Sequence, residues 1–276
     1  MGLRIFNNVE AQNAHRQLQM TNQHLSRTME KLSSGLRINR AADDAAGLAV
    51  SEEMRTQIRG MRVASRNALD GVSLVQVADG ALVGVNDMLQ RVRDLAVQAA
   101  NGTFSDQQRQ NLDQEVQQVM SELARVAQDT EFNGIKILSG SVATAQSAVT
   151  LQVGAQGGQV IAFTIATMSA SDLGVSGLAV STAASATAAL ASIDAAIRSA
   201  NAQRASLGAI QNRLEQTIYR LILTAENLQA AESRIRDADM AAEMIEFTKQ
   251  QILQQSGTAM LAQANQAPQS VLQLLG

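Results

Sequence analysis

Apolar side chains recur along this chain with the alternating four- and three-residue spacing of helices that pack on other helices. The pattern fills five stretches, so we expect helices at about 44–100, 105–129 and 188–236, and one helix toward each end of the chain. The main positions are Leu18, Leu25 and Leu32, then Ile58, Val75, Leu82 and Leu89, then Leu112, Val119 and Leu123, then Ile193, Leu207 and Leu214, and finally Met244, Ile252 and Met260. The predicted fold class is mainly α, with long helices in coiled-coil-like bundles.

Polar residues interrupt two of these apolar seams. Ser65, Asp79 and Asn86 break the second stretch, and Arg204 and Gln211 break the fourth. A polar side chain inside a helical seam favours one register at a cost in stability. We interpret these positions as register markers.

The period changes to two in the middle of the chain. Leu151 and Val153, and then Ile161 and Phe163, alternate on either side of the turn-rich segment GAQGGQ. This spacing predicts a β-hairpin, followed by a Ser/Ala/Thr-rich loop. The hairpin and loop region, about 134–187, is too short for a large separate domain.

Helix punctuation supports the same division. The segment NGTFSDQQR separates the second helix from the third, with Asn101-Gly102 as a stop and Ser105 or Asp106 as the N-cap. Pro268 leaves room for only a short final helical turn.

The two ends of the chain carry apolar stripes that we expect them not to bury alone. Residues 3–36 offer about ten large apolar side chains, too few to offset the conformational entropy lost when a segment of this length is ordered. Pairing with the apolar C-terminal helix still leaves much apolar surface exposed to water. We therefore expect both ends to need neighbours, foremost other copies of this chain.

Composition excludes several classes of function. The chain has 276 residues, of which 46% are hydrophobic and only 2% aromatic, so aliphatic side chains and alanine must fill the core. The net charge of −3 argues against nucleic-acid binding. Cysteine is absent, which removes disulfides and thiolate chemistry. The N-terminus has no apolar signal-peptide region, and no segment has about 18 uninterrupted apolar residues, so we expect neither a cleaved signal nor membrane insertion.

Catalytic and metal sites find little support in the residues. Asp43 and Asp44 are adjacent, but neighbouring helical residues do not face each other, so we expect helix capping and local salt bridges to Arg37 or Arg40. His15 and His24 lack the spacing of metal ligands, and no phosphate-binding or nucleophile motif occurs. We expect no enzymatic activity, no cofactor and no metal.

Several long segments then resemble bacterial flagellins. They are KLSSGLRINRAADDAAGLAVSEEMR, NALDGVSLVQVADGAL, LQRVRDLAVQAANGT, TEFNGIKILSG, TAENLQAAESRIRDADMAAEM and QILQQSGTAMLAQANQAPQSVLQLL. The resemblance covers roughly residues 1–140 and 188–276. It implies an inner coiled-coil domain with connector, 1–43 and 240–276, and a shaft domain, 44–239.

The resemblance also implies a function and partners. A flagellin self-assembles with many copies of itself into the extracellular flagellar filament used for swimming. It leaves the cell by type III export, without a cleaved signal peptide. Its further partners would be an export chaperone at the C-terminal region, the filament cap and the hook-junction proteins.

Two sets of residues acquire roles through the resemblance. Arg37, Arg40, Asp43 and Asp44 lie in what resembles the connector, with capping and contacts to adjacent subunits as expected roles. The vertebrate innate immune receptor TLR5 docks on the flagellin shaft, and the matching residues here are Leu89, Gln90, Arg91, Leu95, Gln98 and Glu115. Arg91 would supply a forked donor and Leu95 an apolar contact.

The chain departs from the family pattern in two places. SGLAVSTAASATAA returns almost directly to the fourth helix, so we expect a short form without variable outer domains. The stretch around Tyr219–Leu223 is more apolar than the family norm, with an effect on interface or supercoil left open. The alternatives are a hook–filament junction protein of the same axial family and a secreted helical effector with amphipathic ends.

Overall fold

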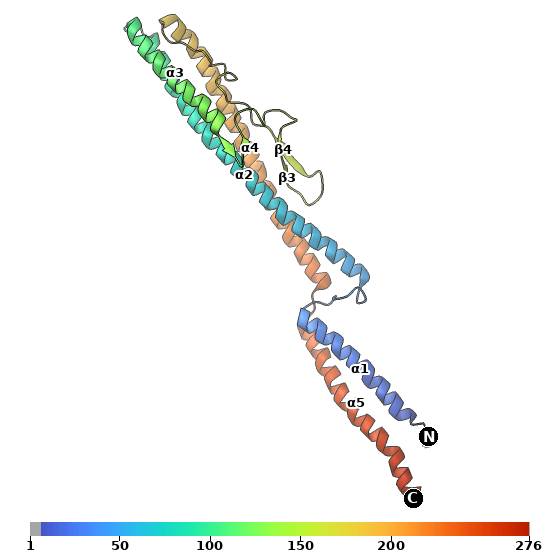
Figure 1. Ribbon diagram of the computed structural model, residues 1–276. Coiled ribbons are helices and arrows are strands. Elements are labelled where there is room, and N and C mark those ends of the chain that lie inside the picture. The colour runs from blue at the N-terminus through green and yellow to red at the C-terminus, as the bar shows by residue number, and fades with distance from the viewer. Residues whose placement is uncertain (1–6, 276) are drawn as a thin grey trace. The chain divides into compact units, whose positions relative to one another are not determined.

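The computed structural model describes residues 7–275, and the side chains of residues 7–266. Its helices are α1 (Val9–Ser34), α2 (Ala45–Ala100), α3 (Asp106–Asp129), α4 (Ala183–Arg236) and α5 (Met240–Leu275) (Figure 1). Its strands are β1 (Glu131–Phe132), β2 (Ile135–Lys136), β3 (Val149–Gln152) and β4 (Val160–Phe163). The predicted fold class, mainly α with a small β-hairpin region, is confirmed.

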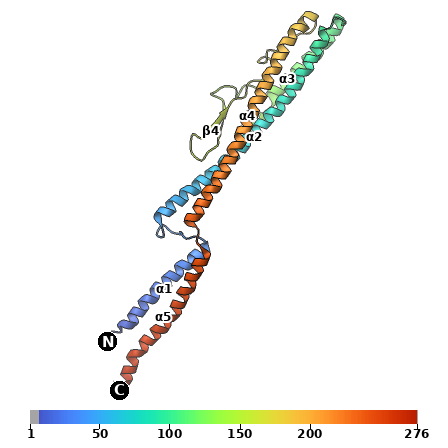
Figure 2. The same ribbon diagram turned by 180° about the vertical axis from the view of Figure 1, so that it is seen from behind.

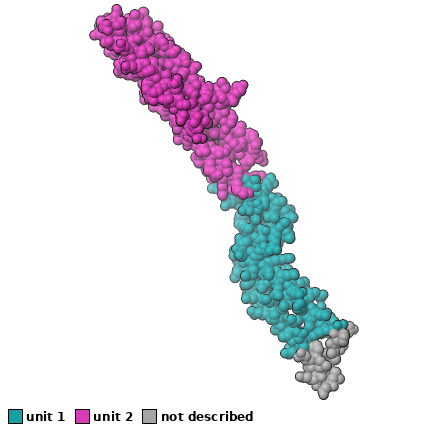
Figure 3. Space-filling model, viewed as in Figure 1, with its two compact units in different colours: residues 1–56, 226–276 teal, residues 57–225 magenta. Residues whose placement is uncertain are grey.

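Contacts between residues divide the chain into two units, coloured separately in Figure 3. Unit 1 contains the chain up to Thr56 and from Glu226 onward, and unit 2 is Gln57–Ala225. The first turns of α2 belong to the same unit as the end of α4, and there Glu52 pairs with Arg236. The division at 43/44 and 239/240 implied by the resemblance stays a prediction, since grouping by contacts does not separate an assembly domain from its connector.

In unit 1, α1 and α5 lie side by side and antiparallel (Figures 1 and 2). The Asn8 side chain at the start of α1 donates to the Ala264 carbonyl at 2.8 Å. Farther along, the Gln254 amide donates to Asn22 at 2.9 Å. The Lys31 ammonium lies 3.1 Å from the Glu243 carboxylate. These polar contacts, spread along the pair, specify one register for two helices whose apolar contact alone would allow several.

Unit 2 has a closed apolar core formed by α2, α3, α4 and the segments between them. Its fully buried large residues include Leu82, Leu89, Leu95, Leu123, Ile193, Leu207 and Leu214. Many neighbours are alanine, for example Ala68, Ala78, Ala96 and Ala200, which lets the helix axes approach closely. An aliphatic and alanine core therefore replaces the missing aromatic residues.

The polar interruptions of the seam lie at the contact of α2 with α4. Asp79 Oδ1 accepts from Arg204 Nε at 2.8 Å. Nearby, Asn86 Oδ1 and Gln203 Nε2 are buried atoms without a hydrogen-bond partner in the described part of the chain. The ion pair favours the register in which Asp79 faces Arg204, which agrees with the register role expected of these two positions.

The middle region forms the expected β-hairpin and then joins the core. β3 and β4 are antiparallel, with Val149 opposite Phe163 and Leu151 opposite Ile161. The following loop buries Ile165, Met168, Val175 and Val180 in the same apolar cluster as the helices. The region is therefore part of unit 2 and not a separate domain.

A second, shorter hairpin, β1–β2, is absent from the sequence prediction. Its turn is Asn133-Gly134, both with positive φ (50° and 77°), the geometry that pairs best with the twist of two short strands. The Asn-Gly dipeptide is typical of tight hairpin turns, so this feature of the sequence could have predicted the hairpin.

Side-chain caps fix two helix starts. The Ser105 hydroxyl accepts from the Gln108 N–H while the Gln108 side chain accepts from the Ser105 N–H, so Ser105 is the N-cap of α3. At α4, the Ser185 N–H donates to the Thr182 hydroxyl at 3.1 Å. That cap lets α4 begin at Ala183, ahead of the expected 188.

α2 is long and apolar enough to cross a membrane by length and composition alone. No membrane span was expected here, because charged residues interrupt the apolar run in the sequence. Leu82, Val85 and Leu89 of this helix are completely buried in unit 2. Part of the apolar character of α2 therefore serves packing within the unit.

Replacing Leu82 by Ala should destabilise unit 2, whereas replacing its neighbour Val83 should not. Leu82 is fully buried, so truncation leaves a cavity that costs about 2–5 kcal/mol. Val83 is on the exposed face, so Val83→Ala should change the free energy of unfolding by about 0.5 kcal/mol or less. Urea unfolding of the full chain followed by circular dichroism measures both. Equal effects would contradict the assigned core.

Candidate assembly and receptor surfaces

The connector leaves α1 through a left-handed glycine. Gly35 has φ 71°, and its N–H donates to the Lys31 carbonyl at 2.8 Å. A residue with a Cβ is strained at this φ, so glycine is the residue that closes the helix without cost. The chain then runs antiparallel to the segment after α4: the Arg37 N–H donates to the Arg236 carbonyl at 2.6 Å and the Ala238 N–H to the Gly35 carbonyl at 2.9 Å.

The two adjacent aspartates hold different parts of the connector. Asp44 Oδ1 accepts from the Gly47 N–H at 2.8 Å and thereby caps the start of α2. Asp43 Oδ2 accepts from the N–H groups of Arg40 and Asn39, at 3.0 and 3.2 Å. These backbone donors, Arg40 first, lower the pKa of the Asp43 carboxyl because they favour its charged form. The Asp44–Gly47 bond agrees with the expected capping role, whereas contacts of Arg37, Arg40, Asp43 and Asp44 with adjacent subunits stay a prediction.

The expected salt bridges from these aspartates to Arg37 or Arg40 are not formed. The Arg37 guanidinium donates to the Ile235 carbonyl, and the Arg40 guanidinium donates to Glu30 at 2.9 Å. Asp43 Oδ2 and Asp44 Oδ1 instead accept from backbone N–H groups of the same turns. Among residues 7–266, no group of three or more His, Cys, Asp or Glu side chains is arranged to hold a metal ion.

Two further residues fix the connector and were not found from the sequence. Ile38 is almost completely buried, and its Cδ1 would be 2.9 Å from a Cβ placed on Gly47. Arg236 donates to the Glu52 carboxylate, which is the first cause of the lowered pKa of Glu52. The apolar helical periodicity ends before both residues, so the hydrophobic pattern could not predict a role for either.

The six residues matched to the receptor surface divide between surface and core. Gln90, Arg91 and Gln98 are exposed on α2, and Glu115 is half-buried on α3. Arg91 Nε donates to Glu115 Oε1 at 3.0 Å, with a second bond from its Nη2, so these two residues are brought together. Leu89 and Leu95 are 0% and 2% exposed. The apolar contact expected of Leu95 is therefore unavailable at the surface of this chain.

Buried Arg109 was also missed, although it supports this end of unit 2. Its guanidinium donates to the Ala99 and Asn101 carbonyls at 2.8 and 3.0 Å and pairs with Asp106. It thus satisfies carbonyl groups at the C-terminal end of α2, which the helix itself leaves without partners. Arg109 is a single arginine in a polar stretch, so the apolar periodicity that predicts core residues does not identify it.

Unit 1 leaves a large share of its apolar side chains exposed. On α5 these are Met240, Met244, Ile245, Ile252, Leu253 and Met260, and on α1 they are Val9, Met20 and Met29. A two-helix pair buries one face of each helix and leaves the other faces in water. Contiguous exposed apolar surface of this kind marks interaction sites.

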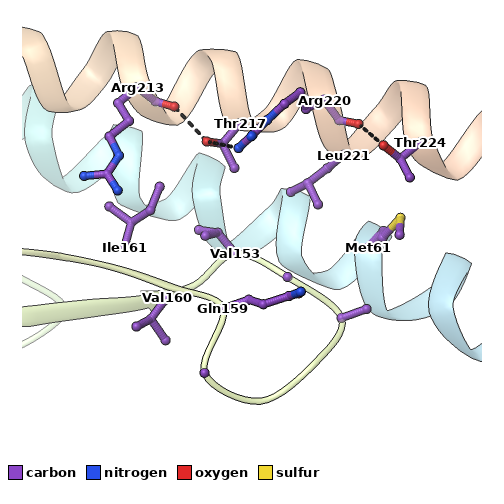
Figure 4. Close-up of a pocket in the computed structure, with 13 residues that line it drawn as sticks. Met61, Val153, Gln159, Val160, Ile161, Arg213, Thr217, Arg220, Leu221 and Thr224 are labelled. Atoms are coloured by element: carbon purple, nitrogen blue, oxygen red, sulfur yellow. Dashed lines mark hydrogen bonds between the residues drawn. The ribbon is translucent and has the colours of Figure 1, made fainter.

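Unit 2 also has a groove between α4 and the turn of the β3–β4 hairpin (Figure 4). Its volume is about 490 Å³. Arg213, Thr217 and Arg220 line it from α4; Arg220 donates to the Thr217 hydroxyl at 3.3 Å, and that hydroxyl donates to the Arg213 carbonyl at 2.9 Å (Figure 4). The groove holds no nucleophile–base pair and no cluster of acids.

Comparisons with known proteins point to one family. The family model described as the bacterial flagellin N-terminal helical region matches residues 5–143, and the bacterial flagellin C-terminal helical region matches residues 190–275. The chain is 51% identical to the flagellar filament 33 kDa core protein of Treponema phagedenis and 50% identical to a flagellin of Halalkalibacterium halodurans. Each match covers 98% of this chain and 99% of the relative. A crystal structure of Bacillus cereus flagellin is 31% identical, with a TM-score of 0.49, over 60% of this chain and 94% of that one.

The two matching family regions and the filament-protein relatives define the chain as a structural protein and not an enzyme. The chain belongs to the bacterial flagellin family. It is a short form, because α4 follows the hairpin loop directly and no variable outer domain lies between them.

Replacing Asp44 by Ala should fray the start of α2, whereas Asp44→Asn should not. The alanine variant leaves the Gly47 N–H without its acceptor, a loss of about 1 kcal/mol, and asparagine caps nearly as well. Hydrogen exchange at the Gly47 amide, followed by mass spectrometry, should quicken about fivefold only in the alanine variant. Faster exchange in both variants would show that charge, and not the cap, is what matters.

Proposed function

We propose that this chain is a structural subunit that self-assembles into the bacterial flagellar filament, outside the cell, for swimming motility. The single observation that carries the proposal is the exposed apolar face of the α1–α5 pair, including Ile245, which is 71% exposed. Burial of this face against other copies removes apolar area from water at about 25 cal/mol per Å². Membership of the flagellin family, and relatives named as flagellins and filament core proteins, support the same role.

Further partners belong to the proposal through the same surfaces. The apolar face of α5 suits an export chaperone that shields the C-terminal region before assembly. Export by the flagellar type III route belongs to the same proposal. The hook-junction proteins would contact the first subunits of the filament, and the filament cap would contact the last.

Two alternatives predict different behaviour. A hook–filament junction protein would be present in a few copies, so purified chain would not form long polymers. A secreted helical effector would act on membranes, and its monomer would release dye from liposomes without forming filaments.

Seeded polymerisation tests the assembly proposal. Purified wild-type chain at neutral pH, mixed with filament fragments, should form filaments visible by electron microscopy and sedimentation. The double variant Ile245→Gln and Ile252→Gln should fail or need at least tenfold more protein, because both exposed side chains lose their apolar contacts. Gln255→Ala, also on the exposed surface of α5, serves as the matched control and should polymerise normally. Wild-type chain that stays monomeric with every seed would contradict the proposal.

We further propose that the free monomer is recognised by TLR5 through α2 and α3 of unit 2. The exposed residues available for contact are Gln90, Arg91 and Gln98, with Glu115 on α3. Leu89 and Leu95 support this surface from the core. The Arg91–Glu115 pair lies at the surface, and an arginine that presents several donors is a common centre of interfaces.

Arg91→Ala should weaken receptor signalling at least tenfold, while Arg93→Ala should leave it within about twofold. The side chains are similarly exposed, 56% and 45%, but Arg93 is directed to Asp194 on α4. A TLR5 reporter-cell assay with monomer measures both, and thermal unfolding checks that both variants fold. Leu95 is left unchanged because its truncation would disturb the core. Equal potency of the two variants and the wild type would refute this surface.

A further inference from the structure

The groove between α4 and the β3–β4 hairpin has walls that are fixed to one another (Figure 4). The Asn67 side chain on α2 donates to the Gln152 carbonyl at 3.1 Å, which ties the hairpin to α2. The tip of the hairpin lies against α2 at Gly60, where an added Cβ would be 2.8 Å from the Ala155 Cβ. Glycine at position 60 allows this close approach, so the groove is already formed in the free chain.

Side chains within the hairpin also fix the shape of its turn. The Gln152 amide donates to the Gln156 carbonyl at 2.6 Å, and the Gln159 side-chain carbonyl accepts from the Gln156 N–H at 3.3 Å. Ala155 and Gly158 both line the groove, and their backbone N–H groups have no acceptor within the described part of the chain. The turn is therefore an ordered wall with backbone donors open to a ligand.

Two arginines supply the charge of the groove from α4. Arg213 and Arg220 are about two helical turns apart, so they lie on one face of α4, on either side of buried Thr217. The Arg213 side chain points from α4 toward the hairpin beside Ile161, and the Arg220 side chain runs back along the helix to Thr217 (Figure 4). The Thr217 hydroxyl accepts from Arg220 Nη2 at 3.3 Å and holds that guanidinium at the wall of the groove.

The positive charge of these arginines is not balanced within the groove. Among the described residues, neither Arg213 nor Arg220 forms a salt bridge, and the Arg213 side chain forms no hydrogen bond. No aspartate or glutamate is among the residues that line the groove. A guanidinium is a forked donor that matches the oxygens of a phosphate group. The groove thus offers two such forks to an anion.

We propose that this groove binds a soluble anion with two linked phosphate groups, one for each arginine. The Cα atoms of Arg213 and Arg220 are about 10 Å apart along the helix axis, a spacing that two joined phosphates can bridge and a single small anion cannot. Apolar side chains of Met61, Val153 and Leu221 form much of the remaining wall, and charge pairs beside apolar surface are stronger than in water. The groove volume of about 490 Å³ leaves room for such an anion. The inference goes beyond the proposed assembly function and does not depend on it.

Calorimetric titration of the full-length monomer with sodium pyrophosphate tests the inference. At physiological salt, the wild-type chain should bind one pyrophosphate with a Kd below about 1 mM. Inorganic phosphate should bind at least about tenfold more weakly, because it occupies only one fork. Absence of pyrophosphate binding, or equal affinity for the two anions, would overturn the inference.

Arg213→Gln and Arg220→Gln should each weaken pyrophosphate binding at least about tenfold, because each removes one fork. Both side chains are exposed, so thermal unfolding of the free variants should match that of the wild type. Arg198→Gln is the matched control, since it removes the same charge from an exposed position of α4 outside the groove. It should leave the Kd within about twofold of the wild-type value. Equal weakening in this control would reveal unspecific attraction and overturn the inference.

Nuclear magnetic resonance of the labelled monomer locates the bound anion. Pyrophosphate should shift the amide signals of Ala155 and Gly158 in the wild type but not in Arg213→Gln. Shifts confined to other parts of the chain would contradict the assigned site. Because the measurement uses monomer, failure of the chain to form filaments leaves the result intact.

Vesicles of phosphatidylglycerol distinguish a lipid headgroup from a soluble anion as the source of phosphate. Each headgroup carries one phosphate and occupies one fork, so the monomer should not sediment with the vesicles. Sedimentation with vesicles without binding of pyrophosphate would overturn the inference in favour of a membrane surface.

Discussion

The fold of unit 1 depends on a geometric limit: two helices packed side by side can bury only the faces that meet. α1 and α5 meet through a face tied by polar contacts at Asn8, Asn22 and Lys31, and their remaining apolar side chains point to water. Specific hydrogen bonds thus set the register, while apolar burial stays incomplete. A pair of this kind is ordered in one arrangement and still gains free energy when further helices cover it.

Unit 2 solves the same problem within one chain. A third helix and the segment after β4 cover the faces that α2 and α4 leave open, and the buried loop residues Ile165, Met168 and Val180 join the helical core. Exposed large apolar residues make up a smaller share of the larger unit 2 than of unit 1, although unit 2 also carries them along α2, at Val63, Leu69, Val77, Val83 and Val97. Assembly in this chain is therefore expected to rest first on unit 1, with unit 2 supplying selectivity through smaller surfaces.

Helical periodicity predicted most of this fold. The seam residues of α2 and α4, the register role of Asp79 and Arg204, and the β3–β4 hairpin all follow from spacing. The seam also assigned Leu89 to the core, while the family resemblance assigned the same residue to a receptor surface. The structure places it in the core, because side-chain direction on a helix is fixed by spacing. A motif match with a family identifies the segment that is involved more reliably than it identifies the side chains that face outward.

The features that the sequence did not reveal share a physical cause. Arg109 acts through backbone carbonyl groups, Arg236 through a residue far along the chain, and Ile38 through burial in the connector, all at points where helices end. A helix end leaves carbonyl or N–H groups without partners, and many side chains can satisfy them. Periodicity stops at such points, so the sequence shows that a joint exists but not which residue completes it. In this chain the joint is held by one left-handed glycine, one aspartate cap and a short antiparallel bridge between Leu36 and Asp237. Because most of these bonds use backbone atoms or short side chains, the connector needs little apolar burial, and the apolar residues of unit 1 remain free for contacts with other copies.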